Sequence, residues 1–372
     1  MGIGRLLLAV FLATGSAGAQ WEILPSGNTA DLRGIDAVRG GIAWASGTNG
    51  TVLRTVDGGK SWKHCATPPG AEHLDFRAVQ AFDGTNAIVV SSGKGPLSRV
   101  YKTTNACQSW TLLFTNPDAD GFFDALQFSD RANGIILGDP VNGSMALWTT
   151  HHGGTKWTRV PPDGLKVPAD TGAFAASNSS LLVDGRLLIT AFVTGGPQPA
   201  IYWRPLVTAI GPYAWKQSAY WSKADLPLAK GATAGAYSIA SNGDFNLLGT
   251  QRPALFTRMV VVGGDYQKAG EAAGTAAFTN DGGRTWYAAR TSPHGFRSAV
   301  AYDSTAKTWI TVGPNGTDVS PDDGRDWRAL KPSKGEPSDV DQHWNALSLP
   351  FVVGPHGRIG KLRADALKQS AP

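Results

Sequence analysis

A short motif recurs along the chain and constrains its fold more than any other feature. The motif has the form Ser/Thr-x-Asp-x-Gly-x-Thr/Ser-Trp, and near-complete copies occupy residues 55–62, 279–286 and 320–327. Degraded copies occupy residues 103–110 and 150–157. Motifs of this kind are Asp-boxes, which recur in propeller proteins. Copies at intervals that fit one four-stranded unit indicate a fold built from repeated blades.

Each position of the Asp-box has a physical role in a tight turn. The aspartate can accept hydrogen bonds from backbone N–H groups of its own turn. The glycine supplies the positive φ that such a turn requires. The tryptophan begins the next strand and caps the core between neighbouring sheets. We therefore predict a structural role for one set of residues: Asp57, Gly59, Trp62, Asn105, Trp110, Trp157, Asp281, Gly283, Trp286, Asp322, Gly324 and Trp327.

The segments upstream of the boxes predict the inner strands. Each has an aromatic residue or Leu, then a variable residue, then small and aliphatic residues. Seven such openings lie at residues 32–35, 76–79, 123–126, 174–175, 237–238, 296–299 and 344–347. The 46 glycines and 23 prolines leave room only for short strands between them. We predict an all-β fold, a seven-bladed β-propeller of four-stranded antiparallel blades over residues 20–365, with a tail at 366–372.

The two ends of the chain predict how the ring closes. After each box the tryptophan opens a short phrase that reads as the outermost strand of a blade. Residues 21–25 match that phrase without a preceding box, whereas the last repeat, at 352–362, stops before any tryptophan. The N-terminal strand should therefore be the outer strand of the seventh blade, paired with residues near the C-terminus. This pairing would remove the exposed edges of the first and last blades.

Tandem Asp-box blades over nearly the whole chain resemble the photosystem II stability and assembly factor family, including its non-photosynthetic, loosely named oxidoreductase-like relatives. The best-matched segments are 46–62 and 312–327. The resemblance implies an exported assembly chaperone that binds a protein segment, has no catalysis and carries a basic patch on one face. Secreted sialidases, xyloglucan-cleaving glycosidases and sorting receptors also use Asp-boxes, so these motifs specify the fold better than the role.

The variable positions of the inner strands are the candidate binding residues, because inner strands line the central channel of a propeller. Arg33, Arg77 and Arg297 are expected to gather near one mouth with Asp124 and Asn345. Guanidinium groups from separate blades would bind carboxylates of an acidic protein segment. The alternative is that each arginine pairs locally or faces solvent.

A secreted glycan-binding or glycan-cleaving propeller is the second functional hypothesis, since sialidases also place three arginines at a propeller centre. The Arg-Ile-Pro signature of those enzymes is absent, and no Glu can be assigned to activate Tyr237 as a nucleophile. The available carboxylates, Asp36, Asp75, Asp124 and Asp265, show no spacing that pairs them across a cleft. We assign no catalytic residue and favour a non-enzymatic role.

Residues 1–19 have the pattern of a signal peptide: an early Arg5, an apolar block at 6–13, and a small-residue end that predicts cleavage after Ala19. We expect an exported, periplasmic or extracellular protein, and a monomer. Its partner would be a protein, such as a membrane-protein segment exposed to the periplasm. The net charge is +5, but the sequence contains no run of basic residues, so nothing in it suggests a nucleic-acid partner.

The sequence indicates no cofactor and no metal. It contains no strand–GxGxxG–helix unit for a dinucleotide. Residues 116–127 imitate the start of a calcium loop but have Gln127 where a bidentate Glu is needed, and the His151-His152 pair has no further ligands in reach. The two cysteines, Cys65 and Cys107, could form a disulfide in an exported protein, and the sequence leaves their pairing open.

Overall fold

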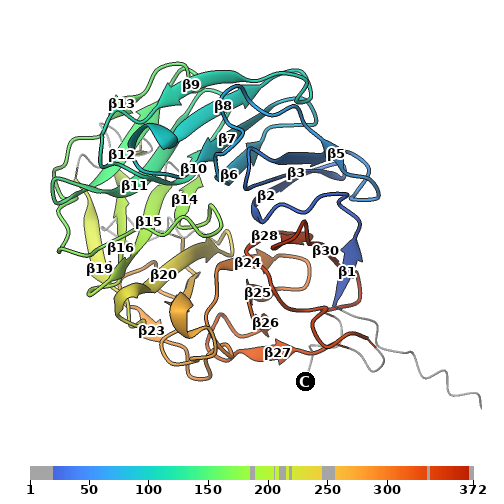
Figure 1. Cartoon of the computed structure of the whole chain (residues 1–372). Coiled ribbons are helices and arrows are strands. Elements are labelled where there is room, and N and C mark those ends of the chain that lie inside the picture. Colours follow the sequence, from blue (N-terminus) through green and yellow to red (C-terminus); the bar gives the residue numbers. More distant parts are fainter. Residues whose placement is uncertain are drawn as a thin grey trace, which may run out of the picture.

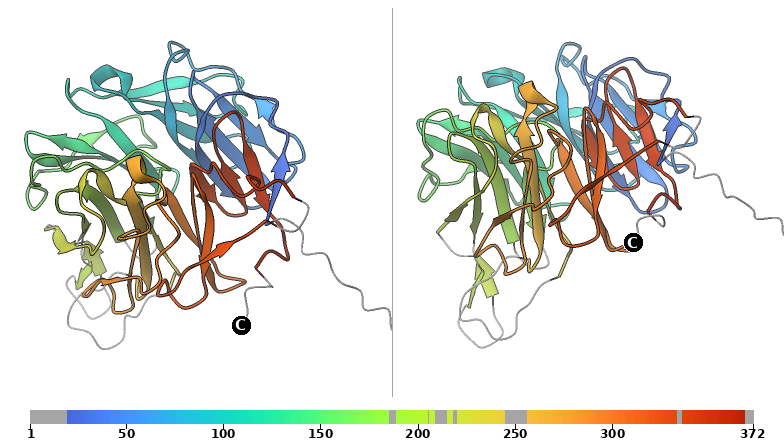
Figure 2. Two further views of the ribbon diagram at one scale, coloured as in Figure 1. Left: turned by 60° about the horizontal axis from the view of Figure 1, so that its bottom comes forward. Right: turned by 90° about the horizontal axis from the view of Figure 1, so that it is seen from below.

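The computed structural model describes residues 20–184, 189–204, 206–208, 215–217, 220–244, 256–332 and 336–367. In these ranges the chain forms a ring of β-blades around a central axis (Figure 1). The strands run from one face of the ring to the other (Figure 2). None of the described helical segments is long and apolar enough to span a bilayer. The predicted signal peptide lies outside the described residues.

Four blades consist of strands that follow one another in the chain, from the inner to the outer edge. Blade 1 contains β2 (Leu32–Val38), β3 (Ile42–Gly47), β4 (Val52–Thr55) and β5 (Lys63–His64). Blade 2 contains β6 (Phe76–Ala81), β7 (Ala87–Ser91), β8 (Arg99–Thr103) and β9 (Thr111–Thr115). Blade 3 contains β10 (Phe123–Phe128), β11 (Gly134–Val141), β12 (Ser144–Thr150) and β13 (Thr158–Arg159). Blade 6 contains β24 (Ala299–Asp303), β25 (Thr308–Gly313), β26 (Gly316–Ser320) and β27 (Arg328–Leu330).

Blades 4 and 5 share one sheet and depart most from the repeat. Blade 4 contains β14 (Leu181–Asp184), β15 (Ile189–Gly196), β16 (Ala200–Arg204) and β19 (Ser222–Asp225), with an added hairpin of β17 (Leu206–Thr208) and β18 (Trp215–Gln217). Blade 5 contains β20 (Gly231–Ser241), β21 (Met259–Asp265), β22 (Ala276–Thr279) and β23 (Tyr287–Ala288). The inner strand predicted at 174–175 is wrong, because β14 fills that place and residues 174–175 lie in an irregular segment.

The Asp-boxes form the hydrogen-bonded turns that the motif predicts. In the first box, Thr55 Oγ1 donates to Asp57 Oδ1 (2.8 Å), and the Ser61 N–H donates to the same oxygen (3.0 Å). Gly59 has a φ of +88° and donates its N–H to Thr55 Oγ1 (3.1 Å). The boxes at 279–286 and 320–327 repeat these contacts. Each aspartate therefore fixes a corner of its blade.

The degraded box of blade 2 keeps the same turn with substitutes. Asn105 Oδ1 accepts the Ser109 N–H (3.1 Å), and the Cys107 N–H donates to Thr103 Oγ1 (3.1 Å). Cys107 stands in the glycine position with a φ of +61°. It forms a disulfide with Cys65, with the two Cα atoms 5.1 Å apart. The bond ties the segment after β5 of blade 1 to the box of blade 2.

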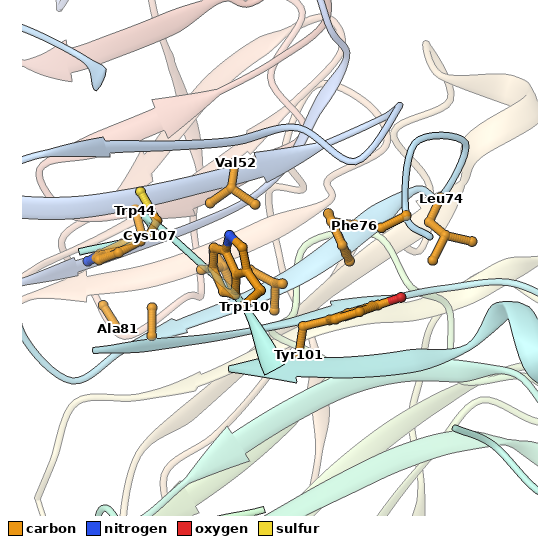
Figure 3. Close-up of a cluster of buried hydrophobic side chains, with 12 residues drawn as sticks. Trp44, Val52, Leu74, Phe76, Ala81, Tyr101, Cys107 and Trp110 are labelled. Atoms are coloured by element: carbon orange, nitrogen blue, oxygen red, sulfur yellow. The ribbon is translucent and has the colours of Figure 1, made fainter. Parts of the chain in front are cut away.

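The box tryptophans fill the space between neighbouring blades. Trp110 of blade 2 packs edge-on against Trp44 of blade 1, with ring centroids 6.4 Å apart. Figure 3 shows this buried cluster, in which Phe76 and Tyr101 lie on the other side of Trp110. Trp62 of blade 1 makes a similar contact with Phe351 of blade 7 at 5.8 Å. Apolar packing between sheets therefore holds adjacent blades together.

The ring closes as the sequence predicts. Strand β1 (Trp21–Leu24) pairs antiparallel with β30 (Ile359–Leu362) and completes blade 7 with β28 (Ala346–Ser348) and β29 (Phe351–Val353) (Figure 1). Trp21 is fully buried, and its ring centroid lies 5.9 Å from that of Trp344. Its Nε1–H donates to Thr317 Oγ1 of blade 6 (2.9 Å). The N-terminal strand therefore joins two blades as well as closing one.

Replacing the closing tryptophan should weaken the whole ring. We expect Trp21→Ala to lower the free energy of unfolding in urea by about 3–5 kcal/mol, because it removes a fully buried indole and its hydrogen bond. Glu22→Ala, an exposed change in the same strand, is the control and should stay within roughly 0.5 kcal/mol of wild type. A Trp21→Ala protein as stable as the control would show that closure contributes little.

Candidate binding site at the channel mouth

β-Bulges aim four inner-strand side chains at one cavity. The pairing register shifts by one residue at Arg33, Arg77, Asp124 and Tyr237, in blades 1, 2, 3 and 5. A bulged residue leaves the alternation of its strand and turns its side chain in a new direction. All four line the same cavity of about 750 Å³, joined by Asn345 of blade 7. In blades 1, 2 and 3, the variable position of the sequence pattern is therefore the bulge position.

Arg297 does not reach this cavity, and its predicted place at the mouth is wrong. Its side chain is fully buried, and Nε donates to Asp318 Oδ2 (2.8 Å). One terminal nitrogen donates to Asn315 Oδ1 (2.6 Å), and His294 Nδ1 lies 2.8 Å from Asp318 Oδ1. A carboxylate in a fully buried strand, as Asp318 is in β26, requires a buried cation as partner. Arg297 fills that role in blade 6.

The lining of the cavity divides into three sectors. The basic sector contains Arg33 and Arg77 from blades 1 and 2. The acidic sector contains Asp124 and Asp139 from blade 3 and Asp170 from the segment that follows it. The aromatic sector contains Phe122, Phe174, Tyr237, Tyr266 and Phe296. The mouth is therefore of mixed charge: two of the three arginines expected there share the cavity with three aspartates.

Both arginines of the basic sector already have an acidic neighbour. Arg77 Nε donates to Asp75 Oδ2 (2.8 Å), and one of its terminal nitrogens lies 3.4 Å from the Ala175 carbonyl oxygen. Arg33 lies 3.9 Å from an Asp31 oxygen. About a third of each arginine side chain remains exposed, 32% for Arg33 and 31% for Arg77. Each arginine is therefore paired with a nearby aspartate and is still accessible from the cavity.

The acidic sector holds an unusual buried carboxyl group. Asp124 is only 2% exposed, and its Oδ2 has no hydrogen-bond partner among the described residues. Burial and the nearby charge of Asp139 raise the pKa of Asp124 well above its ordinary range, although Arg77 opposes this rise. Asp139 Oδ1 accepts the Ala173 N–H (3.0 Å), and burial raises the pKa of Asp139 too. Two carboxyl groups therefore share one wall of the mouth.

A stacked aromatic pair faces the same cavity. The rings of Phe174 and Tyr237 lie parallel, with centroids 4.1 Å apart, and Phe296 meets Tyr237 edge-on at 4.7 Å. Gly195 makes room for this pair, because a Cβ there would lie 2.2 Å from the Phe174 ring. The absence of a side chain also lets β15 approach β20 at Gly235. The aromatic sector thus depends on a glycine outside the cavity.

The segment 174–179, which we call the plug, closes the central channel. Asn178 Oδ1 accepts the Leu126 N–H of blade 3 (2.8 Å), and its amide nitrogen donates to the Val79 carbonyl of blade 2 (3.3 Å). Ser177 Oγ donates to the Ser298 carbonyl of blade 6 (2.7 Å). Residues 174–176 line the mouth cavity, whereas 177–179 line a second cavity of about 270 Å³. The mouth is therefore a cup and not the entrance of a pore.

The carboxylates considered for glycan cleavage do not face one another. Asp36 lines the second cavity, on the other side of the plug from Asp124. Asp75 is bound to Arg77, and Asp265 accepts hydrogen bonds from Thr233 Oγ1 (2.7 Å) and the Gln267 N–H (3.0 Å). The described residues also contain no cluster of three or more His, Cys, Asp or Glu placed to hold a metal ion.

Comparison with known proteins supports the fold. No protein-family profile and no curated protein matches the sequence. Two similar solved structures are YCF48 bound to a D1 peptide, with 16% identity and a TM-score of 0.59, and YCF48 from Cyanidioschyzon merolae, with 17% and 0.54. The similarity covers 93% of this chain in both cases, and 97% and 100% of those chains. This chain shares the fold of YCF48. The shared fold agrees with the Asp-box propeller expected from the sequence.

Several cavity residues were not found from the sequence. Asp139 lies at the end of β11, Asp170 and Phe174 belong to the connection before β14, and Tyr266 belongs to η2 (Tyr266–Lys268). Asp170 and Tyr266 lie outside the blade strands, Phe174 imitates the aromatic opening of an inner strand without forming one, and Asp139 lies on β11 at a position that the repeated motif does not mark. Their common signal is interruption of the repeat, since loops carried on a rigid scaffold commonly provide binding residues. Blade 4 held a second missed signal: Trp221 stands directly before its outer strand, as the box tryptophans do.

The glycine below the aromatic pair provides a test of the site. We expect Gly195→Ala to destabilise the protein by about 1–3 kcal/mol, because the new Cβ would overlap the Phe174 ring and the Ala234 carbonyl. Near-ultraviolet circular dichroism should report the displaced Phe174–Tyr237 stack. Gly270→Ala is the control, since nothing lies within 4 Å of its Cβ position. An unchanged spectrum for Gly195→Ala would contradict the proposed dependence.

We predict that the stability of the folded protein depends on pH through the buried carboxyl group of Asp341. Asp341 accepts hydrogen bonds from the hydroxyl of Thr317 (2.5 Å) and from its N–H (3.3 Å). Burial raises its pKa from 3.8 to about 7, although these hydrogen bonds oppose the rise. Because the folded-state pKa is the higher one, this group's contribution to stability is complete below pH 4 and is lost as the pH rises through 7.

Unfolding in urea at several pH values measures this contribution. From pH 4 to pH 8, wild type should lose on the order of 3–4 kcal/mol relative to Asp341→Asn, which keeps an acceptor for Thr317 but cannot ionise. The exposed Asp339→Asn is the matched control and should follow wild type. Parallel pH profiles for wild type and Asp341→Asn would refute the assignment.

Proposed function

We propose that this protein is an exported, non-catalytic binding scaffold that captures a segment of a partner protein in the cup at the channel mouth. The observation that carries the proposal is the cup itself, where bulges and loops of different blades aim charged and aromatic side chains into one space of about 750 Å³. A cavity of this size accommodates a drug-sized ligand or a short stretch of peptide. The ring around it is rigid, so binding would require little ordering of the site.

The similar structure of YCF48 bound to a D1 peptide supports a protein segment as the ligand. In this chain, a carboxylate of the segment would lie against Arg33 and Arg77, whose side chains are about a third exposed, 32% and 31%. Guanidinium groups bind carboxylates through charge-assisted hydrogen bonds. Aspartates 31 and 75 hold the two arginines in place without covering them. The segment would belong to a membrane protein and be presented on the periplasmic side, with the scaffold acting as a monomer in the manner of an assembly factor.

Peptide binding tests this proposal. The probe is a fluorescein-labelled decapeptide of Ala, Leu and Gly with two adjacent Asp residues, compared with its Asn counterpart by fluorescence anisotropy. We expect Arg33→Ala/Arg77→Ala to weaken binding of the Asp peptide at least about tenfold, since both guanidinium groups that would bind its carboxylates are lost. Arg290→Ala, an exposed arginine paired with Asp326 on the outside of the ring, is the control. Equal binding by the double variant and wild type would refute the arginine site.

A glycan ligand is the second candidate, favoured by the aromatic and acidic sectors of the cup. Stacked rings such as Phe174 and Tyr237 beside carboxyl groups could contact a sugar. A glycan array measures binding, and hydrolysis of fluorogenic glycosides measures cleavage. Selective glycan binding that depends on Tyr237, without binding of the Asp peptide, would replace the protein-segment proposal with this one.

A further inference from the structure

The part of the cup away from Arg33 and Arg77 is lined by acidic and aromatic side chains. The acidic sector provides Asp124, Asp139 and Asp170, and the aromatic sector adjoins it through Phe174 and Tyr237. We propose that these two sectors form a cation site, which receives a lysine or arginine side chain of the same bound segment. The inference rests on the proposed function and deepens it: the preferred segment carries a basic residue close to its carboxylate.

The buried Asp124 is the first observation that points to a cation. Its carboxyl group is 98% buried and lines the cup, yet Oδ2 has no hydrogen-bond partner among the described residues. Arg77, whose charge acts on Asp124, is already engaged by Asp75 Oδ2 (2.8 Å) and the Ala175 carbonyl (3.4 Å). The Asp139 backbone N–H supplies one hydrogen bond to this carboxyl group. A buried carboxyl oxygen without a donor is still costly, and a ligand cation would supply the donor that Oδ2 lacks.

Asp139 makes the ionised form of Asp124 still more costly. The charge of Asp139 acts on Asp124 and, with burial, raises its pKa. Asp139 has one backbone donor, the Ala173 N–H at 3.0 Å from Oδ1. Two carboxyl groups that repel each other become compatible when an ammonium or guanidinium group lies beside both. Asp170 is exposed at the rim and would draw a cation toward them.

The aromatic sector is the second and independent observation. Phe174 and Tyr237 present a stacked pair, Phe296 packs edge-on against Tyr237, and Tyr266 is 51% exposed at the rim. Faces of aromatic rings attract cations, and the attraction is larger where water is excluded. Carboxyl groups on one side and ring faces on another are the surroundings in which proteins hold ammonium and guanidinium groups.

The distribution of charge over the ring then decides the orientation of the segment. Arg33 and Arg77 come from blades 1 and 2, whereas Asp124 and Asp139 come from blade 3 and the aromatic rings mainly from blades 4 to 6. A segment whose carboxylate meets the arginines would place a nearby basic side chain on the acidic and aromatic wall. A segment with acidic residues alone would meet repulsion there. The cup therefore selects a mixed-charge segment over an acidic one.

A small cation tests the site without any peptide. The probe is n-butylammonium, with n-butanol as the neutral control of similar shape, observed by saturation-transfer NMR. We expect wild type to transfer at least about threefold more saturation to the cation, and Asp124→Asn/Asp139→Asn to abolish the difference. Asp163→Asn, an exposed aspartate in a turn outside the cup, is the matched control. Equal transfer to cation and alcohol by wild type would overturn the inference.

Peptides then separate this inference from the proposed function. Decapeptides carry the two Asp residues and one Lys at spacings of two to five residues, and each is compared with its acetyl-lysine form. We expect the best Lys peptide to bind about tenfold more tightly than its acetylated form, and Asp124→Asn/Asp139→Asn to remove this preference. Thermal melting checks that the variant is folded.

The two hypotheses fail in different ways. If Asp peptides bind through Arg33 and Arg77 but lysine acetylation has no effect, the cation site is wrong and the proposed function stands. If the cation site binds n-butylammonium but no peptide depends on the arginines, the proposed function is wrong and the cation belongs to another ligand. If acetylation weakens binding equally in wild type and in the Asp variant, the preference arises elsewhere and the inference is overturned.

Discussion

The pairing of β1 with β30 is the constraint on which the rest of the structure depends. A propeller blade has one inner and one outer edge, but its two faces must be covered by neighbouring blades. Closure by Trp21–Leu24 gives blade 7 its fourth strand and places Trp21 between Trp344 and Thr317. With the ring closed, every blade has two neighbours. The apolar clusters between blades can then form a continuous belt around the axis.

Side chains near the axis convert this belt into a rigid ring. Ser348 Oγ of blade 7 accepts the Ala37 N–H of blade 1 (3.0 Å). Asp36 of blade 1 in turn accepts the Ala81 N–H of blade 2 (2.8 Å). Gln80 continues the series by accepting the Phe128 N–H (2.6 Å). The inner strands of blades 7, 1, 2 and 3 are thus held in register with one another. The plug adds contacts across the axis, so the bulged residues of separate blades keep fixed positions around one cup.

The sequence predicts the architecture well because its signals are local. An Asp-box turn is specified within eight residues, and the unmatched phrase at 21–25 indicates closure without knowledge of any long-range contact. The inner-strand pattern also located Arg33, Arg77, Asp124 and Asn345, which the structure brings to one cavity. Arg297 occupies the same position of the pattern but is buried, since Asp318 on β26 of the same blade binds it. The pattern specifies the position of a side chain along the strand and does not specify its partners.

The plug shows a different reason for failure. The stretch at 174–175 has the composition of an inner strand because Ala175 is buried and Phe174 half-buried at the centre of the ring, where aromatic and small residues are also required. Burial is common to both structures, and hydrogen bonding distinguishes them: the Asn178 side chain binds backbone groups of blades 2 and 3. The charge of the mouth could not be predicted for a related reason. Asp139 enters it from β11, at a position that the repeated motif does not mark, and Asp170 enters it from the connection between blades 3 and 4.

The shared blade 7 also has a consequence for how the molecule assembles. Trp21 and Leu362 are paired although they lie 341 positions apart in the sequence (362 − 21), so the first strand to leave the ribosome is among the last to find its partner. Until then, its backbone groups and its indole ring are available to other chains, as those of any open sheet edge are. Contacts of such long sequence separation form slowly. The protein, which we infer to assist the assembly of others, therefore passes through an open ring during its own folding. In that state blades 1 to 6 can be formed, but the outward faces of the first and last blades are not yet covered.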